Sequence, residues 1–558
     1  MQLTPAKKIW VAFRTSGARI SVIEKSKTAY NELHSDSVLY SSYDDPSSWN
    51  EAIHALLENT PRSLLSATQS ICVSGTSASC LLVDSVTGEP TRGTRAKMYN
   101  YDISQTIVNQ ESNHQVDSNI NSNSSTSHDV SIQAQQWIDM YAPKNHAARA
   151  NTSALSKLLH YHASFPIVAT ASSSSHSQEV LVHQSEYVAN TIFLSDQSQS
   201  RSRSQSQSQS QSQSQSSEQE VGTVTSVSVE RKYVSDWHNA LKLGYDVRSL
   251  EYPEWLLSCL TFIGIPTQVL PSVVAPGERI QTISHEMIKR HGFPEHTVIV
   301  GGTTDSNAAF IAAAAGIGGI PSYGMAVTSL GSTLAIKMLS RTFVEDSDRG
   351  VYSHRFPTLS RHEDGNDNDD LFTSASTKPS ISANTSPAQV DAGEELWLVG
   401  GASNVGCAVL RKENFSNEEL VDLSKDMDIS TDSALKYYPL TKIGERFPIA
   451  DGKKEPILDP KPDYECKRNS RGEYLKGILQ GISQVEVMGF EILGELGANP
   501  SFPNVVMTAG GGSKNHAWLK MRERLLRESL GGDAVTVRKA ENAEASFGAA
   551  VLAASSFT

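Results

Sequence analysis

Short runs of apolar residues, each followed by glycine, serine or threonine, recur along this chain. In one of them, Val298-Ile299-Val300 precedes Gly301-Gly302, two threonines and Asp305, after which an alanine-rich stretch begins. The β-branched run predicts a buried strand, the two glycines predict a sharp turn, and the alanines predict a helix. Asp305 is therefore expected at the carboxyl end of a strand, where ligands bind in open α/β sheets. The alternative is an aspartate that only caps the helix.

Two further patterns predict hairpins with similar turns. The first, from Ile9 to Glu24, turns at Thr15-Ser16-Gly17, and the second, from Ala326 to Lys337, turns at Gly331-Ser332-Thr333. The tip of such a hairpin presents backbone N–H groups and hydroxyls that can surround a phosphate. An ordinary hairpin, which is the commoner case, is the alternative for each.

The remaining hydrophobic pattern predicts a mixture of helices and strands. Helices are expected over Pro46–Leu57, Ala154–His162, Glu179–Phe193 and Tyr474–Leu496, and strands over Trp397–Gly401 and Val505–Met507. Gly510-Gly511-Gly512 follows the last strand, and the missing Cβ atoms suit a slot for a flat base. Neither a Walker A loop nor the GxGxxG spacing of a dinucleotide-binding fold occurs at these turns.

Polar tracts interrupt this pattern. Three polar insertions are expected to be disordered: one near residues 110–130, one in two parts near 171–178 and 195–222, and one near 358–393. A chain of 558 residues also exceeds the size of a single core, so two or more domains are expected.

Composition narrows the class of protein. The net charge of −13 argues against nucleic acid or an anionic membrane as the main partner. No apolar run reaches the ~18 residues that span a bilayer, and the first residues lack the features of a signal peptide. The cysteines are scattered and form no CxxC pair, which predicts a reducing compartment without a disulfide framework or a zinc site. We expect a cytoplasmic protein, or a plastid one if a preceding transit segment is missing.

Together these turns provide what phosphoryl transfer from a nucleotide requires. Such a reaction needs N–H and hydroxyl donors around the phosphates, a carboxylate that accepts the proton of an attacking hydroxyl, and a slot for the base. The two hairpin turns, Asp305 and the glycine turn at 510–512 are candidates for these three parts.

The chain resembles the FGGY family of carbohydrate kinases, and most closely the ribulose/xylulose kinase-like branch of cyanobacteria and plants. Nine segments carry the resemblance in the family's order: TSGAR (15–19), SGTSAS (74–79), MYN (98–100), WHNALKLGYD (237–246), GTTDS (302–306), SLGSTLAIK (329–337), GGASNVG (400–406), GGGSKN (510–515) and ASFGAA (545–550). The resemblance implies an α/β fold of two actin/hexokinase-like (ribonuclease H-like) domains with a cleft between them. A sugar-binding domain is expected over residues 1–296 and a nucleotide-binding domain over 297–558.

The resemblance also implies roles for individual residues. Asp305 would be the catalytic base, would contact the sugar, and would reach Mg²⁺ only through water. The expected ATP contacts are Thr15, Ser16, Gly331, Ser332, Thr333, Gly400, Gly511, Gly512, Asn515 and Trp518. The expected sugar contacts are Ser77, Tyr99 and Asn100, for which a turn hydroxyl and an aromatic at the edge of a core are the structural alternatives.

One segment departs from the family's pattern. The family's first hairpin has Asp-x-Gly-Thr, where the aspartate helps to hold Mg²⁺, and this chain has Ala12-Phe13-Arg14-Thr15. Alanine offers no oxygen to a metal, and the Arg14 guanidinium cannot replace a metal ligand. Three explanations stay open: a wrongly assigned start of the gene, a slow kinase that relies on Asp305, and a pseudokinase that binds sugar or nucleotide without turnover.

The sequence thus predicts an ATP- and Mg²⁺-dependent kinase of a pentulose, with D-ribulose preferred to D-xylulose. The alternative is a catalytically impaired sugar- or nucleotide-binding protein. The expected partners are a small-molecule sugar and ATP, without nucleic acid or membrane, and the expected state is a monomer or homodimer.

Overall fold

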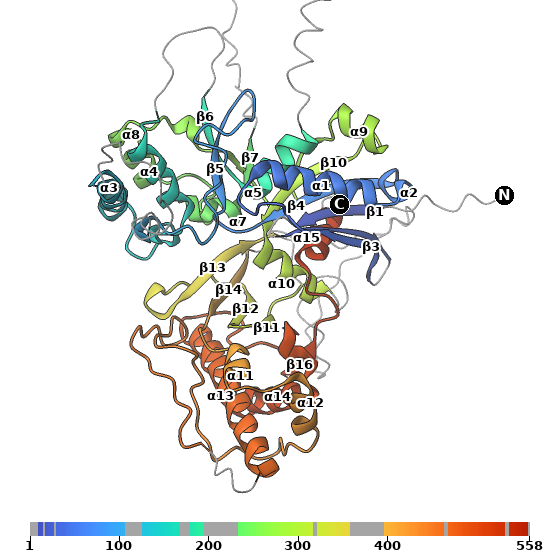
Figure 1. The fold of residues 1–558 in the computed structure, drawn as a ribbon, viewed down its shortest axis with the longest axis vertical. Coiled ribbons are helices and arrows are strands. Elements are labelled where there is room, and N and C mark those ends of the chain that lie inside the picture. Colours follow the sequence, from blue (N-terminus) through green and yellow to red (C-terminus); the bar gives the residue numbers. More distant parts are fainter. Residues whose placement is uncertain are drawn as a thin grey trace, which may run out of the picture. The chain divides into compact units, whose positions relative to one another are not determined.

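A computed structural model of the chain describes residues 9–14, 17–26, 29–105, 125–167, 178–194, 233–315, 321–357, 395–461, 467–530 and 535–555. These residues form two compact units, one of Met1–Ala309 with Glu544–Ser556 and the other of Phe310–Ala543 (Figure 1). Almost all of the expected insertions, namely 110–124, 171–177, 195–222 and 358–393, lie outside the described residues. The exceptions are residues 125–130, which helix α3 covers because it begins at Ser125, and Gln178.

The first unit is built on a six-stranded sheet. The order of its strands is β3 (Tyr30–Val38), β2 (Ala18–Lys25), β1 (Ile9–Arg14), β4 (Thr68–Gly75), β10 (Val298–Thr304) and β9 (Arg279–Thr282). Strands β1, β4 and β10 run parallel, and β2, β3 and β9 pair antiparallel with their neighbours. The hairpin predicted from Ile9 to Glu24 is therefore confirmed as β1 and β2.

Helices cover both faces of this sheet. The helix α1 (Pro46–Asn59) buries Trp49, Ile53 and Leu56 with the side chains of Val11 and Phe13. The helix α15 (Ala545–Ser555) covers the opposite face, where Ser21 bonds Ser546 at 2.7 Å (Figure 1).

The other elements of the first unit form a smaller helical layer and two short sheets. Helices α3 and α4 pack together over a second apolar core that also takes in α8. The elements are β5 (Cys80–Asp84) paired with β6 (Glu179–His183), β7 (Val234–Asp236) paired with β8 (Ser272–Val274), α2 (Arg62–Leu65), α3 (Ser125–Tyr141), α4 (Ala154–Ser164), α5 (Gln184–Val188), α7 (Trp237–Ala240), α8 (Glu254–Ile263) and α9 (His285–His291).

The second unit repeats the strand order of the first. Its sheet runs β13 (Val351–Phe356), β14 (Leu396–Ala402), β12 (Leu334–Ser340), β11 (Met325–Leu330), β15 (Val505–Ala509) and β16 (Thr536–Lys539). Strands β11, β15 and β16 are parallel, while β12 and β14 pair antiparallel. The order β14-β12-β11-β15-β16 therefore matches the order β3-β2-β1-β4-β10 in the first unit. Each neighbouring pair of strands is parallel or antiparallel in the same way in both sheets.

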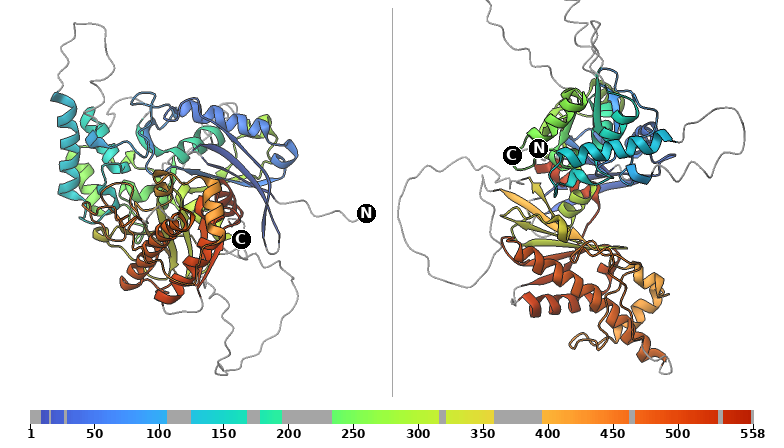
Figure 2. Two further views of the ribbon diagram at one scale, coloured as in Figure 1. Left: turned by 60° about the horizontal axis from the view of Figure 1, so that its bottom comes forward. Right: turned by 90° about the vertical axis from the view of Figure 1, so that its left-hand side faces the viewer.

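Two long helices run side by side in the second unit, as the views in Figures 1 and 2 agree. They are α13 (Lys467–Glu495), which confirms the long buried helix expected over Tyr474–Leu496, and α14 (His516–Leu530). Two shorter helices complete the unit, α11 (Ala408–Lys412) and α12 (Asn417–Lys425).

The division of the chain differs from the expected boundary at residue 296. Strand β10 pairs with β4 and β9 inside the first sheet, so it belongs to the first unit, and the change of unit falls within α10 (Asp305–Ala315). Near the end of the chain, α15 returns to the first unit because it packs on β1, β2 and β4.

Two local predictions were wrong. Residues 179–183 form strand β6 instead of the start of a helix, because Val180 and Val182 alternate in register with β5. Gly301 and Gly302 do not turn but continue β10. A Cβ atom at Gly301 would lie 2.4 Å from the carbonyl oxygen of Ala275, and one at Gly302 would lie 2.5 Å from that of Val73. These glycines therefore allow neighbouring backbones to approach.

Candidate functional site

The first unit gathers several predicted residues at one edge of its sheet. Strands β4 and β10 are parallel neighbours in which Gly75 pairs with Thr304. The chain leaves β4 at Thr76-Ser77 and leaves β10 at Asp305, so both segments lie at the carboxyl ends of adjacent strands. This edge is where open α/β sheets bind ligands. Thr15 and Ser16 lie outside the described residues.

Asp305 is half-buried at the start of α10. Its Oδ1 accepts a hydrogen bond from the Ser306 N–H at 2.8 Å. Among the described residues, Oδ2 has no hydrogen-bond partner. One oxygen of the Asp305 carboxylate therefore accepts from an N–H of its own helix, and the other oxygen is available to accept a further hydrogen bond.

Lys242 is a charged neighbour of this carboxylate. Burial lowers the pKa of Lys242, and the negative charge of Asp305 acts in the opposite direction. Lys242 belongs to a short 3-10 turn, Leu241–Leu243, that follows α7. This segment, WHNALKLGYD, carries part of the family resemblance, but nothing in its pattern indicates Lys242 as a site residue.

A buried polar network that involves β7 and α7 is hydrogen-bonded to β10. His238 Nδ1 and Thr303 Oγ1 are 2.7 Å apart. Asp236 caps α7, accepting from the backbone N–H of His238 at 2.9 Å and of Asn239 at 3.1 Å. Burial raises the pKa of Asp236 to about 6; hydrogen bonds from Asn239 oppose the rise, and the charge of Glu186 adds to it.

The predicted sugar contacts lie together in the first unit. Ser77 is half-buried, whereas Tyr99 and Asn100 are exposed. The Tyr99 N–H donates to Ser79 Oγ at 2.9 Å, which joins the segment of Tyr99 to the turn that carries Ser77. Tyr43 donates to Asn100 Oδ1 at 3.1 Å, so Asn100 is already held by a side chain that the sequence analysis missed.

Two predicted nucleotide turns meet in the second unit. Gly331-Ser332-Thr333 connects β11 to β12, and Gly511-Gly512 begins the short 3-10 helix that follows β15. Strands β11 and β15 are parallel neighbours. A Cβ atom at Gly512 would lie 2.8 Å from the Leu330 Cβ, so the glycine turn packs against the end of β11. Ser332, Thr333 and Gly511 are exposed.

Three predicted ATP contacts have structural roles in the second unit. Gly400 lies inside β14 between β12 and β13, and a Cβ atom there would lie 2.1 Å from the Ile336 carbonyl oxygen. Trp518 is 1% exposed, and its indole N–H donates to Ser483 Oγ at 2.9 Å, so its ring has no face free for a base. Asn515 Oδ1 caps α14 by accepting from the Trp518 N–H at 3.0 Å.

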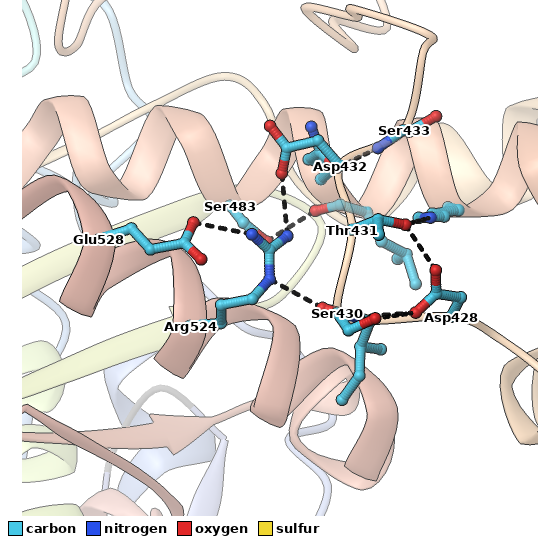
Figure 3. Close-up of polar contacts among 12 residues, drawn as sticks. Asp428, Ser430, Thr431, Asp432, Ser433, Ser483, Arg524 and Glu528 are labelled. Atoms are coloured by element: carbon cyan, nitrogen blue, oxygen red, sulfur yellow. Dashed lines mark hydrogen bonds and ion pairs between the residues drawn. The ribbon is translucent and has the colours of Figure 1, made fainter.

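The other end of the Asn515 amide is bonded to helix α12, and the loop that follows this helix is held by ion pairs. Asn515 Nδ2 donates to Ser424 Oγ on α12 at 2.8 Å. The loop after α12 is tied to α14 by Arg524, which bonds Asp432 at 2.9 Å and Glu528 at 2.7 Å (Figure 3). The glycine turn is therefore flanked by elements that these contacts hold in place.

Arg411 is a third residue that the sequence pattern did not indicate. It lies on α11, is exposed, and donates to Ser332 Oγ at 3.0 Å. A guanidinium beside a serine turn suits a phosphate. Only the fold could reveal it, because Arg411 is far from Ser332 in the sequence.

The described residues do not build a protein site for Mg²⁺. Ala12 is completely buried within β1, where it pairs with Cys72 and Ser21, and it has no ligating atom. The described part of the chain contains no group of three or more His, Cys, Asp or Glu side chains that could hold a metal ion.

No helix among the described residues is long and apolar enough to cross a bilayer. No protein-family model matches the sequence.

Solved structures of sugar kinases do share the fold. A xylulose kinase from Rhodospirillum rubrum is 16% identical, with a TM-score of 0.62 over 98% of this chain and 89% of that chain. A gluconate kinase from Lactobacillus acidophilus is 14% identical, with a TM-score of 0.61 over 98% and 89%. Plasmodium falciparum glycerol kinase with ADP is 13% identical, with a TM-score of 0.59 over 98% and 88%. The expected two-domain fold of the actin/hexokinase type is thus confirmed.

Proposed function

We propose that the protein is an ATP-dependent carbohydrate kinase that phosphorylates a pentulose, with D-ribulose preferred to D-xylulose. The observation that carries the proposal is the position of Asp305 at the end of β10, beside the Thr76-Ser77 segment that leaves β4. A carboxylate with an available oxygen, next to hydroxyl and amide donors, can orient a sugar hydroxyl and accept its proton. The solved sugar kinases with the same fold support the reaction class.

In this proposal the second unit holds ATP. The Gly331-Ser332-Thr333 turn and the Arg411 guanidinium contact the phosphates, and the exposed backbone at Gly511 lies against the base. The first unit binds the sugar through Ser77, Tyr99 and Asn100. Asp305 then accepts the proton of the hydroxyl that attacks the γ-phosphate, and positioning supplies most of the remaining rate enhancement. Mg²⁺ would be held by the nucleotide phosphates and water, with Asp305 as a ligand through water.

A specific observation favours a second candidate function. The position that holds the family's metal-binding aspartate is Ala12, whose side chain is buried in the sheet. A protein without that carboxylate can bind sugar and nucleotide and yet transfer phosphate slowly or not at all. The second candidate is therefore a sugar- or nucleotide-binding pseudokinase.

An ADP-release assay over a panel of ketopentoses separates the two. We expect sugar-dependent ADP release, highest with D-ribulose, from the chain as it stands or from a variant carrying Ala12→Asp and Arg14→Gly. Release only from that variant, together with calorimetric binding of sugar or ATP by the unaltered chain, would identify the chain as a pseudokinase. No sugar-dependent ADP from either form would refute the kinase proposal.

A further inference from the structure

Lys157 on α4 is a fully buried cation. Its side chain has no exposed surface, and its ammonium donates to the carbonyl oxygens of Ala78 at 2.7 Å and Met98 at 2.8 Å. Burial lowers the pKa of Lys157 to about 8. A buried charge is costly unless it is paired or hydrogen-bonded, and in the described part of the chain these two carbonyls are its hydrogen-bond partners.

The first of these carbonyls belongs to a tight turn. The Ser79 N–H donates to the Thr76 carbonyl at 3.1 Å, which closes a turn over Thr76–Ser79. Ala78, the third residue of the turn, has φ of 62°. Glycine is usually found at this position, because a Cβ atom disfavours positive φ. The bond from Lys157 therefore holds the carbonyl of a residue in an unfavourable conformation, next to Ser77.

The second carbonyl belongs to the neighbouring segment. Lys97 exchanges backbone hydrogen bonds with Cys80, at 2.9 and 3.0 Å, and the Tyr99 N–H reaches Ser79 Oγ. Met98 lies between them and is 5% exposed. Lys157 thus links the two segments from the buried side, while Tyr99 and Asn100 are exposed.

We propose that Lys157 is a positioning residue of the sugar site. Its two hydrogen bonds fix the peptide groups of Ala78 and Met98, and through them the distance from Ser77 to Tyr99 and Asn100. The identity of the ligand as a sugar rests on the proposed function, whereas the link between the two segments does not. Small displacements of positioning groups are known to reduce catalysis strongly.

The test compares Lys157→Met, which removes both donors from a side chain of similar length, with Lys157→Gln, which keeps an amide donor. The matched control is Lys476→Met, because Lys476 is also a buried lysine, 4% exposed, on helix α13 of the second unit. Two readouts are needed: hydrogen exchange of peptides that cover residues 76–80 and 97–101, and KM for D-ribulose and for ATP.

We expect Lys157→Met to accelerate exchange at the Tyr99 and Ser79 amides and to raise KM for D-ribulose about tenfold or more, with KM for ATP unchanged. Lys157→Gln should have a smaller effect, and Lys476→Met should leave exchange of both peptides and KM for D-ribulose as in the unaltered protein. Unchanged exchange at both segments in a folded Lys157→Met protein would overturn the proposal. So would equal increases in KM for both substrates.

Two further results remain decisive. If Lys157→Met does not fold, the comparison between Lys157→Gln and the unaltered protein decides by the same two readouts. If the unaltered protein and the Ala12→Asp, Arg14→Gly variant both turn over no sugar, the proposed function fails. In that case, hydrogen exchange of the peptides that cover residues 76–80 and 97–101 still tests whether Lys157 links these two segments.

Discussion

Asp236 lies beside β10, the strand that precedes Asp305, and is buried away from solvent. It is 1% exposed, and a Cβ atom added to Gly302 on β10 would lie 3.4 Å from its Oδ2. Its oxygens accept from two backbone N–H groups and from Asn239 Nδ2, at 2.6 Å, yet burial still raises its pKa to about 6. The site is therefore supported by a carboxyl group that titrates near neutral pH.

This pKa predicts how stability depends on pH. Because the pKa of Asp236 is higher in the folded state than its ordinary value of 3.8, the folded protein binds the proton more tightly. The contribution of Asp236 is present below about pH 4 and is lost as pH rises through about 6. Two pKa units correspond to about 3 kcal/mol. Urea titration should show that Asp236→Asn reduces the fall in the free energy of unfolding between pH 4 and pH 7 by up to that amount.

The neighbouring amide can adapt to the Asp236→Asn variant. Within the described residues, Asn239 Oδ1 is buried without a hydrogen-bond partner, so a flip of the amide would let it accept from the new side chain. The variant should therefore fold at both pH values. An identical pH dependence in the variant and the unaltered protein would show that Asp236 does not titrate in this range.

Single hydrogen bonds show which of the predicted nucleotide-contacting residues also have a structural role. The family resemblance implies that Trp518 and Asn515 contact the nucleotide. The structure uses the indole in the core and the amide as a helix cap. The cap is local, since Asn515 accepts from the N–H three residues later. The local sequence does not show the core role of the indole, because its partner Ser483 comes from a distant segment. Lys242 and Arg411 escaped prediction for the same reason.

At the scale of elements, a buried ion pair fixes the strands that precede both nucleotide turns. Arg522 on α14 donates to both carboxylate oxygens of Glu486 on α13, at 2.6 and 2.7 Å, and to Thr508 on β15 at 2.7 Å. Glu486 also accepts from Thr328 on β11. Arg522 and Glu486 have no exposed side-chain surface, so these bonds are shielded from water.

Breaking this pair should destabilise the second unit strongly. Glu486→Gln leaves the Arg522 charge buried and uncompensated, so we expect a loss of about 3–5 kcal/mol in the free energy of unfolding, measured by urea titration. The double variant Glu486→Leu, Arg522→Met should lose less than Glu486→Gln alone, because no unpaired charge remains. A loss below about 1 kcal/mol in Glu486→Gln would contradict this account.

Most elements followed from the hydrophobic pattern, and the exceptions have physical causes. The hydrophobic period continues without a break through residues 9–24, 326–337 and 474–496. The two hairpins and the long helix are therefore predicted correctly. The segment 179–193 was predicted as one helix, but it changes from strand to helix at Gln184, and the strand forms only because β5 pairs with it. Gly301-Gly302 looked like a turn because glycine permits both turns and close packing.

At the scale of the molecule, the repeated strand order explains why similar turns recur. The hairpin of β1 and β2 and that of β11 and β12 occupy equivalent positions in sheets of the same order. The sequence revealed this only as a shared Gly/Ser/Thr chemistry. It could not reveal that β10 and α15 belong to the first unit, because those assignments depend on strand pairing and packing between segments that are distant in the sequence.

The central claim is that Asp305 accepts a proton during phosphoryl transfer to a pentulose. The most direct test is transfer of labelled γ-phosphate from ATP to D-ribulose by the chain and by Asp305→Asn, with ATP affinity measured in parallel and the Ala12→Asp, Arg14→Gly background used if the unaltered chain is inactive. Because general bases contribute about 10²–10⁴-fold, we expect Asp305→Asn to lower the rate by at least a hundredfold with ATP affinity unchanged. Transfer at an unchanged rate in Asp305→Asn would contradict the claim.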